Sequence, residues 1–237
     1  MSLTPLIEQL RDFDTALIAN TIGALDPTPA HEYYMGGSIV SLTPSLGPTV
    51  GVALTCELDT STPGAKPQME PWYELLKLME KSPDPTVLVI KTTGPRPDHE
   101  CVIGDGMAKM MDSLGCIGLV TDGGVRDIEG IMTVPFAVYG KGRTIHHCAL
   151  RFGRINIPVE VGGITVSPGD VIHANIGGVL RIPPGCLAEL PSRATAMSAF
   201  EHETHCVWRQ AGVSIDEKRK AVAELLVKHG FGGPARR

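Results

Sequence analysis

The chain has 237 residues, of which 43% are hydrophobic and 20% are charged. These are the proportions of a folded globular protein, and they argue against a disordered or fibrous chain. The formal net charge is -5, and the Lys and Arg residues are scattered rather than gathered into a basic stripe, so we expect no nucleic-acid partner. The length suits one large domain as well as two small ones, and we expect a single domain over residues 1–237.

The sequence predicts neither a membrane span nor a secretory signal. No apolar run is long enough to cross a bilayer, and the first twenty residues carry acids where a signal would carry basic residues. The six cysteines lie far apart with no C-x-x-C pair, which argues against a disulfide framework or a structural zinc site. We therefore expect a cytoplasmic protein with no membrane partner and with reduced thiols.

Helices are predicted at both ends of the chain, around a core of residues 38–190. Apolar residues at spacings of three and four predict one or two amphipathic helices over residues 3–25, ending before Asp26-Pro27. The C-terminal region, residues 191–229, is predicted to be helical as well, with a break near Gly212.

The first half of the core combines strands with a long loop. Runs of β-forming residues at 38–42 and 50–58 flank turn residues, so we expect them to pair. Residues 59–71 contain several prolines and no periodicity, and a helix follows them. This loop is a candidate lid over a site, and a passive connector is the alternative.

A strand-helix-strand unit is predicted from residue 86 onward. Residues 86–93 and 116–124 resemble buried strands, residues 104–115 an amphipathic helix, and residues 125–132 a short helix. Further strands are expected at 135–142, at 154–161 and in a hairpin over 170–185. The overall pattern is that of an α/β protein.

Glycine and acidic residues follow the two buried strands, at residues 104–107 and 122–127. In an open α/β sheet, ligands bind at the carboxyl ends of the strands. Gly104 and Gly106 allow a close backbone approach, and the N–H groups of Gly106 and Met107 open a helix, where a carboxylate is well accommodated.

Arg126 and Asp127 offer a bidentate clamp next to a hard oxygen ligand. Together with Asp105, the acids could bind Mg²⁺ or Mn²⁺, which would polarise a carbonyl group while Arg126 holds the ligand and stabilises an enolate. The alternative is a capped turn beside an ordinary surface ion pair. Spacing alone does not decide between the two.

The order of these residues resembles a known family. Asp105, then twenty residues, then Arg126-Asp127 is similar to the D-x20-R-D signature of the RraA-like family, which includes the class II pyruvate aldolases typified by 4-hydroxy-4-methyl-2-oxoglutarate aldolase. The segments LGCIGLVTDGGVRDIEGI, PFAVYGKG and IPVEVGGITVSPGDVIHANIGGVLRIP are similar in order and spacing as well. The resemblance covers roughly residues 70–190.

This resemblance implies a fold and an assembly. The family fold is a β/β/α swivelling-type domain, here with flanking N- and C-terminal helices, assembled as a homotrimer or as a homohexamer of two trimers. The site lies between neighbouring subunits, and a glutamate from the neighbour's C-terminal helix contributes to it. Glu201 or Glu203 would be that glutamate.

The resemblance also implies roles for the site residues. Asp127 would bind the metal directly, Asp105 would hold metal-bound water, and Arg126 would clamp the substrate. The backbone at Gly104, Gly106 and Met107 would cradle a carboxylate. Two departures bear on the substrate: Asn175 stands where an Asp is common, and residues 16–26 lack the usual Ser-Asp.

The histidines suggest other sites less strongly. In the segment 201–205 the two histidines are three residues apart, whereas the helical zinc motif needs four, so a polar helix face is favoured. For His146 and His147 we favour a structural role, with a supporting or acid/base role near the site as the alternative. No nucleotide-binding glycine motif and no G-x-S-x-G elbow occurs.

The sequence therefore predicts a lyase that cleaves a C–C bond next to a small 2-oxo acid through a pyruvate enolate. Aldol cleavage and oxaloacetate decarboxylation share this intermediate, and the sequence does not say which acid is cleaved. The rival is a non-catalytic protein that binds and regulates ribonuclease E, as some RraA-like proteins do. Nothing in the sequence resembles a methyl-donor site, so we set aside the methyltransferase activity sometimes attributed to the family.

Overall fold

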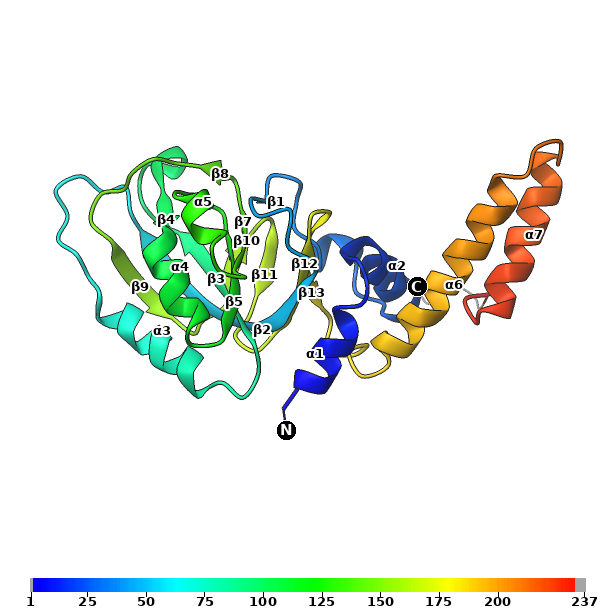
Figure 1. Ribbon diagram of the computed structural model, residues 1–237, viewed down its shortest axis with the longest axis horizontal. Helices are drawn as coiled ribbons and strands as arrows, with labels where there is room; N and C mark the ends of the chain where they lie inside the picture. The colour runs from blue at the N-terminus through cyan, green and yellow to red at the C-terminus, as the bar shows by residue number, and fades with distance from the viewer. Residues whose placement is uncertain (1, 233–237) are drawn as a thin grey trace.

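The computed structural model describes residues 2–232. They form a mixed β-sheet with helices at both ends of the chain (Figure 1). The chain begins with α1 (Thr4–Leu10) and α2 (Thr15–Leu25), which confirms the predicted pair of helices. Asp14 ends the turn between them, because its carboxylate accepts a hydrogen bond of 2.9 Å from the N–H of Leu17 and so caps α2. A 3₁₀ turn, η1 (Ala30–Glu32), leads toward the sheet.

The main sheet has eight strands in the order β1-β7-β5-β3-β2-β12-β13, with β9 pairing on β2 as well. Strands β2, β3, β5 and β7 run parallel, and the other pairings are antiparallel. The strands are β1 (Val40–Ser41), β2 (Thr49–Asp59), β3 (Thr86–Thr92), β5 (Cys116–Thr121), β7 (Ala137–Gly140), β9 (Arg151–Ile155), β12 (Val171–Asn175) and β13 (Gly178–Ile182). The predicted hairpin over residues 170–185 is confirmed by the pairing of β12 with β13.

The expected pairing of residues 38–42 with 50–58 is wrong. Val40 in β1 lies opposite Gly140 in β7, whereas β2 pairs with β3, β12 and β9. Most residues of β2 are buried whichever face they occupy, and such a strand belongs inside a sheet that is covered on both faces.

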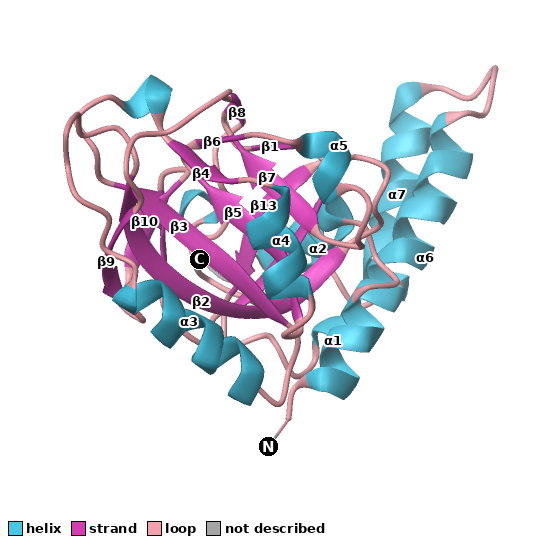
Figure 2. Ribbon diagram, turned by 60° about the vertical axis from the view of Figure 1, so that its left-hand side comes forward, coloured by secondary structure: helices cyan, strands magenta, loops and turns pink. Residues whose placement is uncertain are grey.

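The two faces of the sheet are covered differently. Leu88 and Ile90 of β3 face the helices α3 (Glu70–Lys81), α4 (Asp105–Asp112) and α5 (Ile128–Ile131). Val87 and Val89 face the opposite way, toward the hairpin of β10 (Val159–Val161) and β11 (Ile164–Val166). Figure 2 shows α3 and α4 lying across the curved sheet. The sheet is thus buried on both faces, and its strand ends remain available for a site.

A second, small parallel sheet lies at these strand ends, and the sequence did not predict it. It consists of β4 (Cys101–Ile103), β6 (Gly124–Val125) and β8 (Gly142–Arg143). The strand predicted at 86–93 ends at Thr92, and a 3₁₀ turn, η2 (Pro97–His99), separates it from β4. The pairing of β3 with β5 ends at Thr121. The carboxylate of the next residue, Asp122, then accepts hydrogen bonds from the N–H and the hydroxyl of Thr92.

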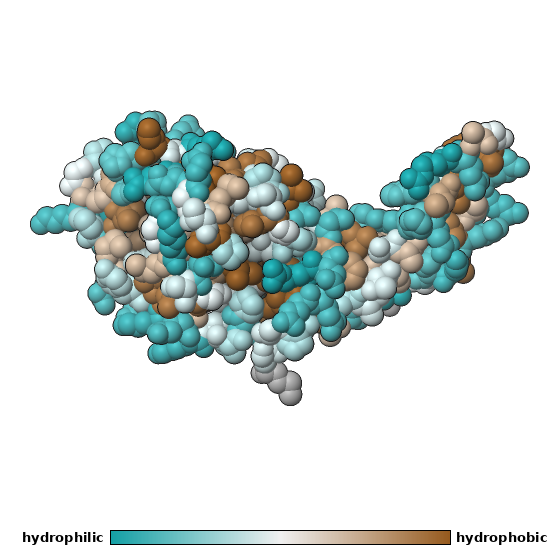
Figure 3. Space-filling model, in the orientation of Figure 1, coloured by the Kyte–Doolittle hydropathy of each residue, from teal (hydrophilic) through white to brown (hydrophobic). Residues whose placement is uncertain are grey.

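The C-terminal helices α6 (Leu190–Trp208) and α7 (Ile215–Lys228) confirm the predicted helical end. The first half of α6 packs with α1, α2 and β13 through Leu190, Ala194 and Met197. Its second half and α7 extend away from the sheet as a hairpin (Figure 1), and Figure 3 shows hydrophilic residues over much of that hairpin. Among the described helices, none has the length and apolar character that a membrane crossing requires.

Candidate active site

A cavity of about 340 Å³ opens beside the N-terminus of α4. It brings together residues that are distant in sequence. Its lining consists of residues 101–107, Met110, Arg126, His147 and Leu150. A second cavity of about 640 Å³ adjoins it and includes Arg126, Asp127 and Glu129 in its lining. Arg126 borders both cavities, so it lies at the centre of the predicted site.

Gly104 allows the two site loops, residues 104–107 and 122–127, to approach each other. It is the residue before α4, with φ -127° and ψ -178°. A Cβ atom at this position would lie 2.9 Å from Asp127 Oδ2 and 3.0 Å from Arg126 Nε. Any larger residue would therefore displace the side chains of Arg126 and Asp127.

Arg126 is positioned by a backbone hydrogen bond and by an ion pair with Asp127, and its Nε lacks a hydrogen bond in the described part of the chain. Its backbone N–H donates to the carbonyl of Ile103 over 3.1 Å, which joins the two loops. Its Nε lies 3.3 Å from Asp127 Oδ2, yet this buried nitrogen makes no hydrogen bond within residues 2–232. Buried donors are normally hydrogen-bonded, so Arg126 keeps hydrogen-bonding capacity that the fold does not use, at a position that lines both cavities.

Asp127 adopts a left-handed backbone conformation, with φ 56° and ψ 39°. Such angles are uncommon outside glycine, and Asp and Asn are among the residues that tolerate them. The turn passes directly from β6 into α5, and the Asp127 side chain makes no capping hydrogen bond to that helix. Its carboxylate is 47% exposed, so it is accessible to a ligand.

Asp105 is the first residue of α4, and a salt bridge fixes its carboxylate. Lys109 Nζ lies 2.7 Å from Asp105 Oδ2, one helical turn away. The hydrogen bond from Lys109 and the charge of its ammonium group lower the pKa of Asp105. The side chain is 40% exposed, so Asp105 presents a negative charge at neutral pH beside Arg126.

Asp105 and Asp127 fit a divalent ion by their chemistry. Mg²⁺ prefers oxygen ligands, keeps several of its waters, and is often bound by one or two carboxylates. Among the residues that the structure describes, no group of three or more His, Cys, Asp or Glu side chains could hold a metal. The two acids of one chain can thus supply part of a coordination shell, with water or another chain completing it.

Glu201 and Glu203 lie on α6, outside both cavities. Glu203 pairs with Lys228 over 2.7 Å and with His229 over 3.2 Å. Glu201 accepts a hydrogen bond of 2.8 Å from the amide of Asn20. Neither glutamate reaches the cavity of its own chain, so a role for either one requires a second copy.

Two features of the site were not predicted. His147 lines the cavity, a place near the site that was given only as the alternative to the favoured structural role. Behind the cavity, the buried carboxylate of Glu100 accepts hydrogen bonds from the N–H and hydroxyl of Thr60 and from the hydroxyl of Ser61. No spacing rule marks Glu100, because its partners are some forty residues away in sequence.

Comparison with known proteins identifies the family. A model of the RraA-like family, described as Aldolase/RraA, matches residues 18–181. The chain belongs to this family. The match confirms the resemblance seen in the spacing of Asp105, Arg126 and Asp127. The family includes aldolases as well as ribonuclease E inhibitors.

Individual relatives agree with this assignment. The chain is 34% identical over 112 residues to a protein of Halalkalibacterium halodurans named "Putative 4-hydroxy-4-methyl-2-oxoglutarate aldolase". The aligned part covers 47% of this chain and 52% of that protein. The chain thus spans about half the length of this relative.

Two solved structures share the fold. An uncharacterized protein from Pseudomonas syringae has a TM-score of 0.70 at 20% identity, covering 92% of this chain and 93% of the other. RraAS2 of Streptomyces coelicolor, described as an unusual member of the RNase ES inhibitor RraA protein family, has a TM-score of 0.67 at 20% identity, covering 85% and 96%. These likenesses confirm a mixed α/β fold of the RraA type.

Proposed function

We propose that this protein is a divalent-metal-dependent lyase that cleaves a C–C bond next to a 2-oxo acid group, releasing pyruvate through its enolate. The observation that carries the proposal is the position of Arg126, whose buried Nε makes no hydrogen bond within the described residues, at a cavity that also contains the first turn of α4. The substrate class is that of 4-hydroxy-4-methyl-2-oxoglutarate, with oxaloacetate decarboxylation as a side activity.

Each residue of the site has a role in this chemistry. The N–H groups of Gly106 and Met107 belong to the first turn of α4, where they have no backbone acceptor within the helix, and they bind the substrate carboxylate. Arg126 orients the substrate and stabilises the negative charge that develops on the enolate oxygen. Asp127 and Asp105 would hold Mg²⁺ or Mn²⁺, with Asp127 as the direct ligand. A bound ion supplies Lewis acidity toward the 2-oxo group.

We propose further that the protein acts as a homotrimer or homohexamer whose neighbouring subunit contributes Glu201 or Glu203. Helix α7 has no buried residue, and its Ile215 and Val227 are 63% and 69% exposed. Such apolar exposure on an extended hairpin is suited to contact with another copy. Mixing inactive Arg126→Ala protein with inactive Glu203→Gln or Glu201→Gln protein tests this, because a shared site regains activity in mixed oligomers.

Pyruvate release by the purified protein tests the proposed function. Activity on 4-hydroxy-4-methyl-2-oxoglutarate and on oxaloacetate is measured with Mg²⁺, with Mn²⁺ and with EDTA, and the Arg126→Ala protein controls for contaminating enzymes. We expect turnover that depends on the metal and on Arg126. Absence of turnover on both acids, with inhibition of ribonuclease E by the same preparation, would instead support a binding protein.

A further inference from the structure

His147 belongs to the cavity, whereas its neighbour His146 does not. The half-buried His147 lines the same cavity as Arg126 and the first turn of α4. His146 is exposed and absent from that lining. The two rings are 5.3 Å apart, so the pair offers a cavity residue with a matched control beside it.

The backbone around His147 is held at several points. The segment between β8 and β9 is joined to β6 by a hydrogen bond from Thr144 N–H to the carbonyl of Val125, 3.0 Å long. Cys148 N–H donates to the carbonyl of Thr60 over 2.7 Å, and Leu150 accepts from Gln68 N–H over 2.9 Å. These bonds attach the loop that carries His147 to the site loops on one side and to residues 60–68 on the other.

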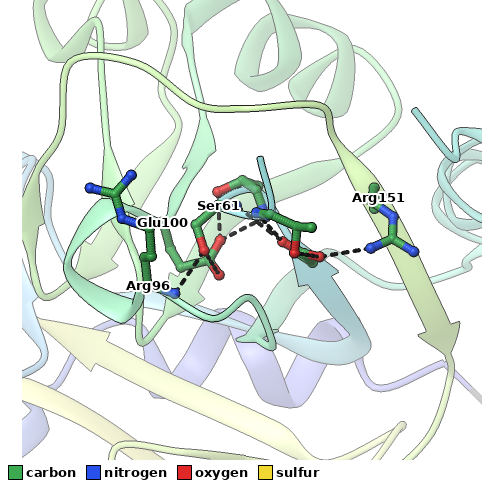
Figure 4. Close-up of polar contacts among 7 residues, drawn as sticks. Ser61, Arg96, Glu100 and Arg151 are labelled. Atoms are coloured by element: carbon green, nitrogen blue, oxygen red, sulfur yellow. Dashed lines mark hydrogen bonds and ion pairs between the residues drawn. The ribbon is translucent and has the colours of Figure 1, made fainter. Parts of the chain in front are cut away.

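Thr60 is itself fixed by the buried Glu100. The Glu100 carboxylate accepts from Thr60 N–H at 2.7 Å and from its hydroxyl at 2.6 Å. The Thr60 hydroxyl accepts from Cys101 N–H at 2.9 Å, at the start of the strand that lines the cavity. Figure 4 shows the neighbouring contacts: Ser61 bonds to Glu100 and to the Arg96 backbone, and Arg151, on the other side, bonds to Asp59. Thr60 therefore connects the two walls of the cavity through these hydrogen bonds.

The hydrogen bond of the imidazole determines its tautomer. Nδ1 of His147 lies 2.5 Å from the carbonyl oxygen of Cys148. A carbonyl oxygen only accepts, so Nδ1 carries the hydrogen, and Nε2 of the neutral ring is left with a lone pair. In the neutral form, Nε2 is therefore the ring nitrogen that can accept a proton.

We propose that His147 is a catalytic residue that accepts the proton of the hydroxyl group at C4 of an aldol substrate; this inference rests on the proposed function. The proton moves from the C4 oxygen to Nε2, and the O–H electron pair forms the new C4 carbonyl. The C3–C4 bond breaks, its electron pair forms the C2–C3 double bond, and the π pair of the C2 carbonyl moves onto its oxygen to give the pyruvate enolate. Oxaloacetate has no hydroxyl at C4, so its decarboxylation requires no such proton acceptor.

The substitution His147→Gln tests this assignment, with His146→Gln as the matched control. Both variants and the wild type are assayed with Mg²⁺ on 4-hydroxy-4-methyl-2-oxoglutarate and on oxaloacetate. For His147→Gln we expect kcat for aldol cleavage to fall by about 10²- to 10⁴-fold, the usual contribution of a general base. Oxaloacetate decarboxylation should stay within about threefold, because the metal and Arg126 act as before. The His146→Gln protein should behave as the wild type in both reactions.

A chemical rescue adds a second measurement. In the His147→Ala protein, added imidazole should restore part of the aldol cleavage, because it can occupy the vacated space and accept the proton. Retained decarboxylation reports that the variants are folded.

The possible outcomes separate the two proposals. Unchanged aldol cleavage in His147→Gln, or an equal loss in both reactions, would overturn the role of His147 and leave the proposed function standing. A wild-type protein inactive on both acids would overturn the proposed function and this step with it. An equal effect of His146→Gln would also count against His147 as the proton acceptor.

Discussion

Arg126 and His173 are two basic side chains in different regions of the molecule, and their hydrogen bonding differs. His173 on β12 is fully buried, with Nδ1 3.0 Å from the hydroxyl of Thr15 and Nε2 3.1 Å from the carbonyl of Leu10. Arg126 has a buried Nε without a hydrogen bond in the described chain. A fully hydrogen-bonded buried group holds the fold together, whereas Arg126, whose side chain is 34% exposed at a cavity, keeps donors that a ligand can use.

The surroundings of the two residues also differ: those of His173 are apolar, and those of Arg126 are polar and partly exposed. His173 connects the sheet to α1 and α2, in a region whose core is a continuous apolar cluster that includes Ile7, Leu10 and Ile18. Around Arg126, two partly exposed carboxylates and a left-handed Asp127 stand at the ends of strands. The first region contributes stability, and the second retains polar groups that folding alone does not require.

Among the variants that compare these two regions, the largest effect is expected from Arg126→Ala. Loss of the guanidinium removes the group that orients the substrate and stabilises the enolate, so kcat/KM for pyruvate release should fall by about 10³-fold. The urea midpoint of unfolding should stay close to that of the wild type, since Arg126 is a partly exposed residue at a cavity. Arg126→Lys keeps the positive charge but lacks the forked guanidinium, so its kcat/KM should lie between those of Arg126→Ala and the wild type. Activity close to that of the wild type in Arg126→Ala would contradict the assigned role.

Asp127→Ala tests the metal site directly. Loss of a direct carboxylate ligand should weaken Mg²⁺ or Mn²⁺ binding by more than the ~100-fold that removal of a supporting residue costs. Isothermal titration calorimetry measures the affinity. The exposed Asp98 on η2 provides the control, because Asp98→Ala removes the same charge away from the cavity. An unchanged metal affinity in Asp127→Ala would show that another residue is the direct metal ligand.

Gly104→Ala tests whether the close approach of the two loops matters. Alanine can adopt the backbone angles of Gly104, but its Cβ would meet Asp127 Oδ2 and Arg126 Nε. Displacement of these groups should lower kcat by about 10- to 100-fold, with little change in the urea midpoint. Gly47→Ala is the matched control, since a Cβ there meets nothing within 4 Å. Equal activities of the two variants would show that the approach is not required.

Much of the fold could be predicted from local patterns. The terminal helices, the buried strands at residues 86–93 and 116–124 and the hairpin at 170–185 carry clear periodicity or turn residues, and the structure confirms them. The pairing of β1 with β7 could not be predicted in this way, because it depends on which strand occupies the centre of the sheet. The small sheet of β4, β6 and β8 was missed because its strands have two or three residues each.

The site was predictable to the extent that its residues are close in sequence or match a spacing. Gly104, Asp105 and Arg126 carry the family signature, so they were found, although they follow β4 and β6 of the small sheet and not the two buried strands that were predicted to precede them. His147 and Glu100 were not assigned to the site, because their positions depend on contacts with Thr60 and Cys148 that no local pattern encodes.

The smallest effect on catalysis, and a clear effect on stability, is expected at His173. Burial lowers its pKa to about 4 from an ordinary value of 6.5. The unfolded chain therefore binds the proton more tightly, so the stabilisation is fully present above pH 6.5 and is lost as the pH falls toward 4, by at most about 3 kcal/mol.

His173→Gln removes this titration while its amide can still donate to the carbonyl of Leu10. The free energy of unfolding, measured with urea between pH 4 and pH 7.5, should depend less on pH in the variant than in the wild type. All other titrating groups are common to both proteins, so the difference between the two curves isolates His173. Because His173 lines neither cavity at Arg126, kcat at pH 7.5 should be unchanged. A variant with the wild-type slope, or with lost activity, would show that the two regions are not as separate as their hydrogen bonding indicates.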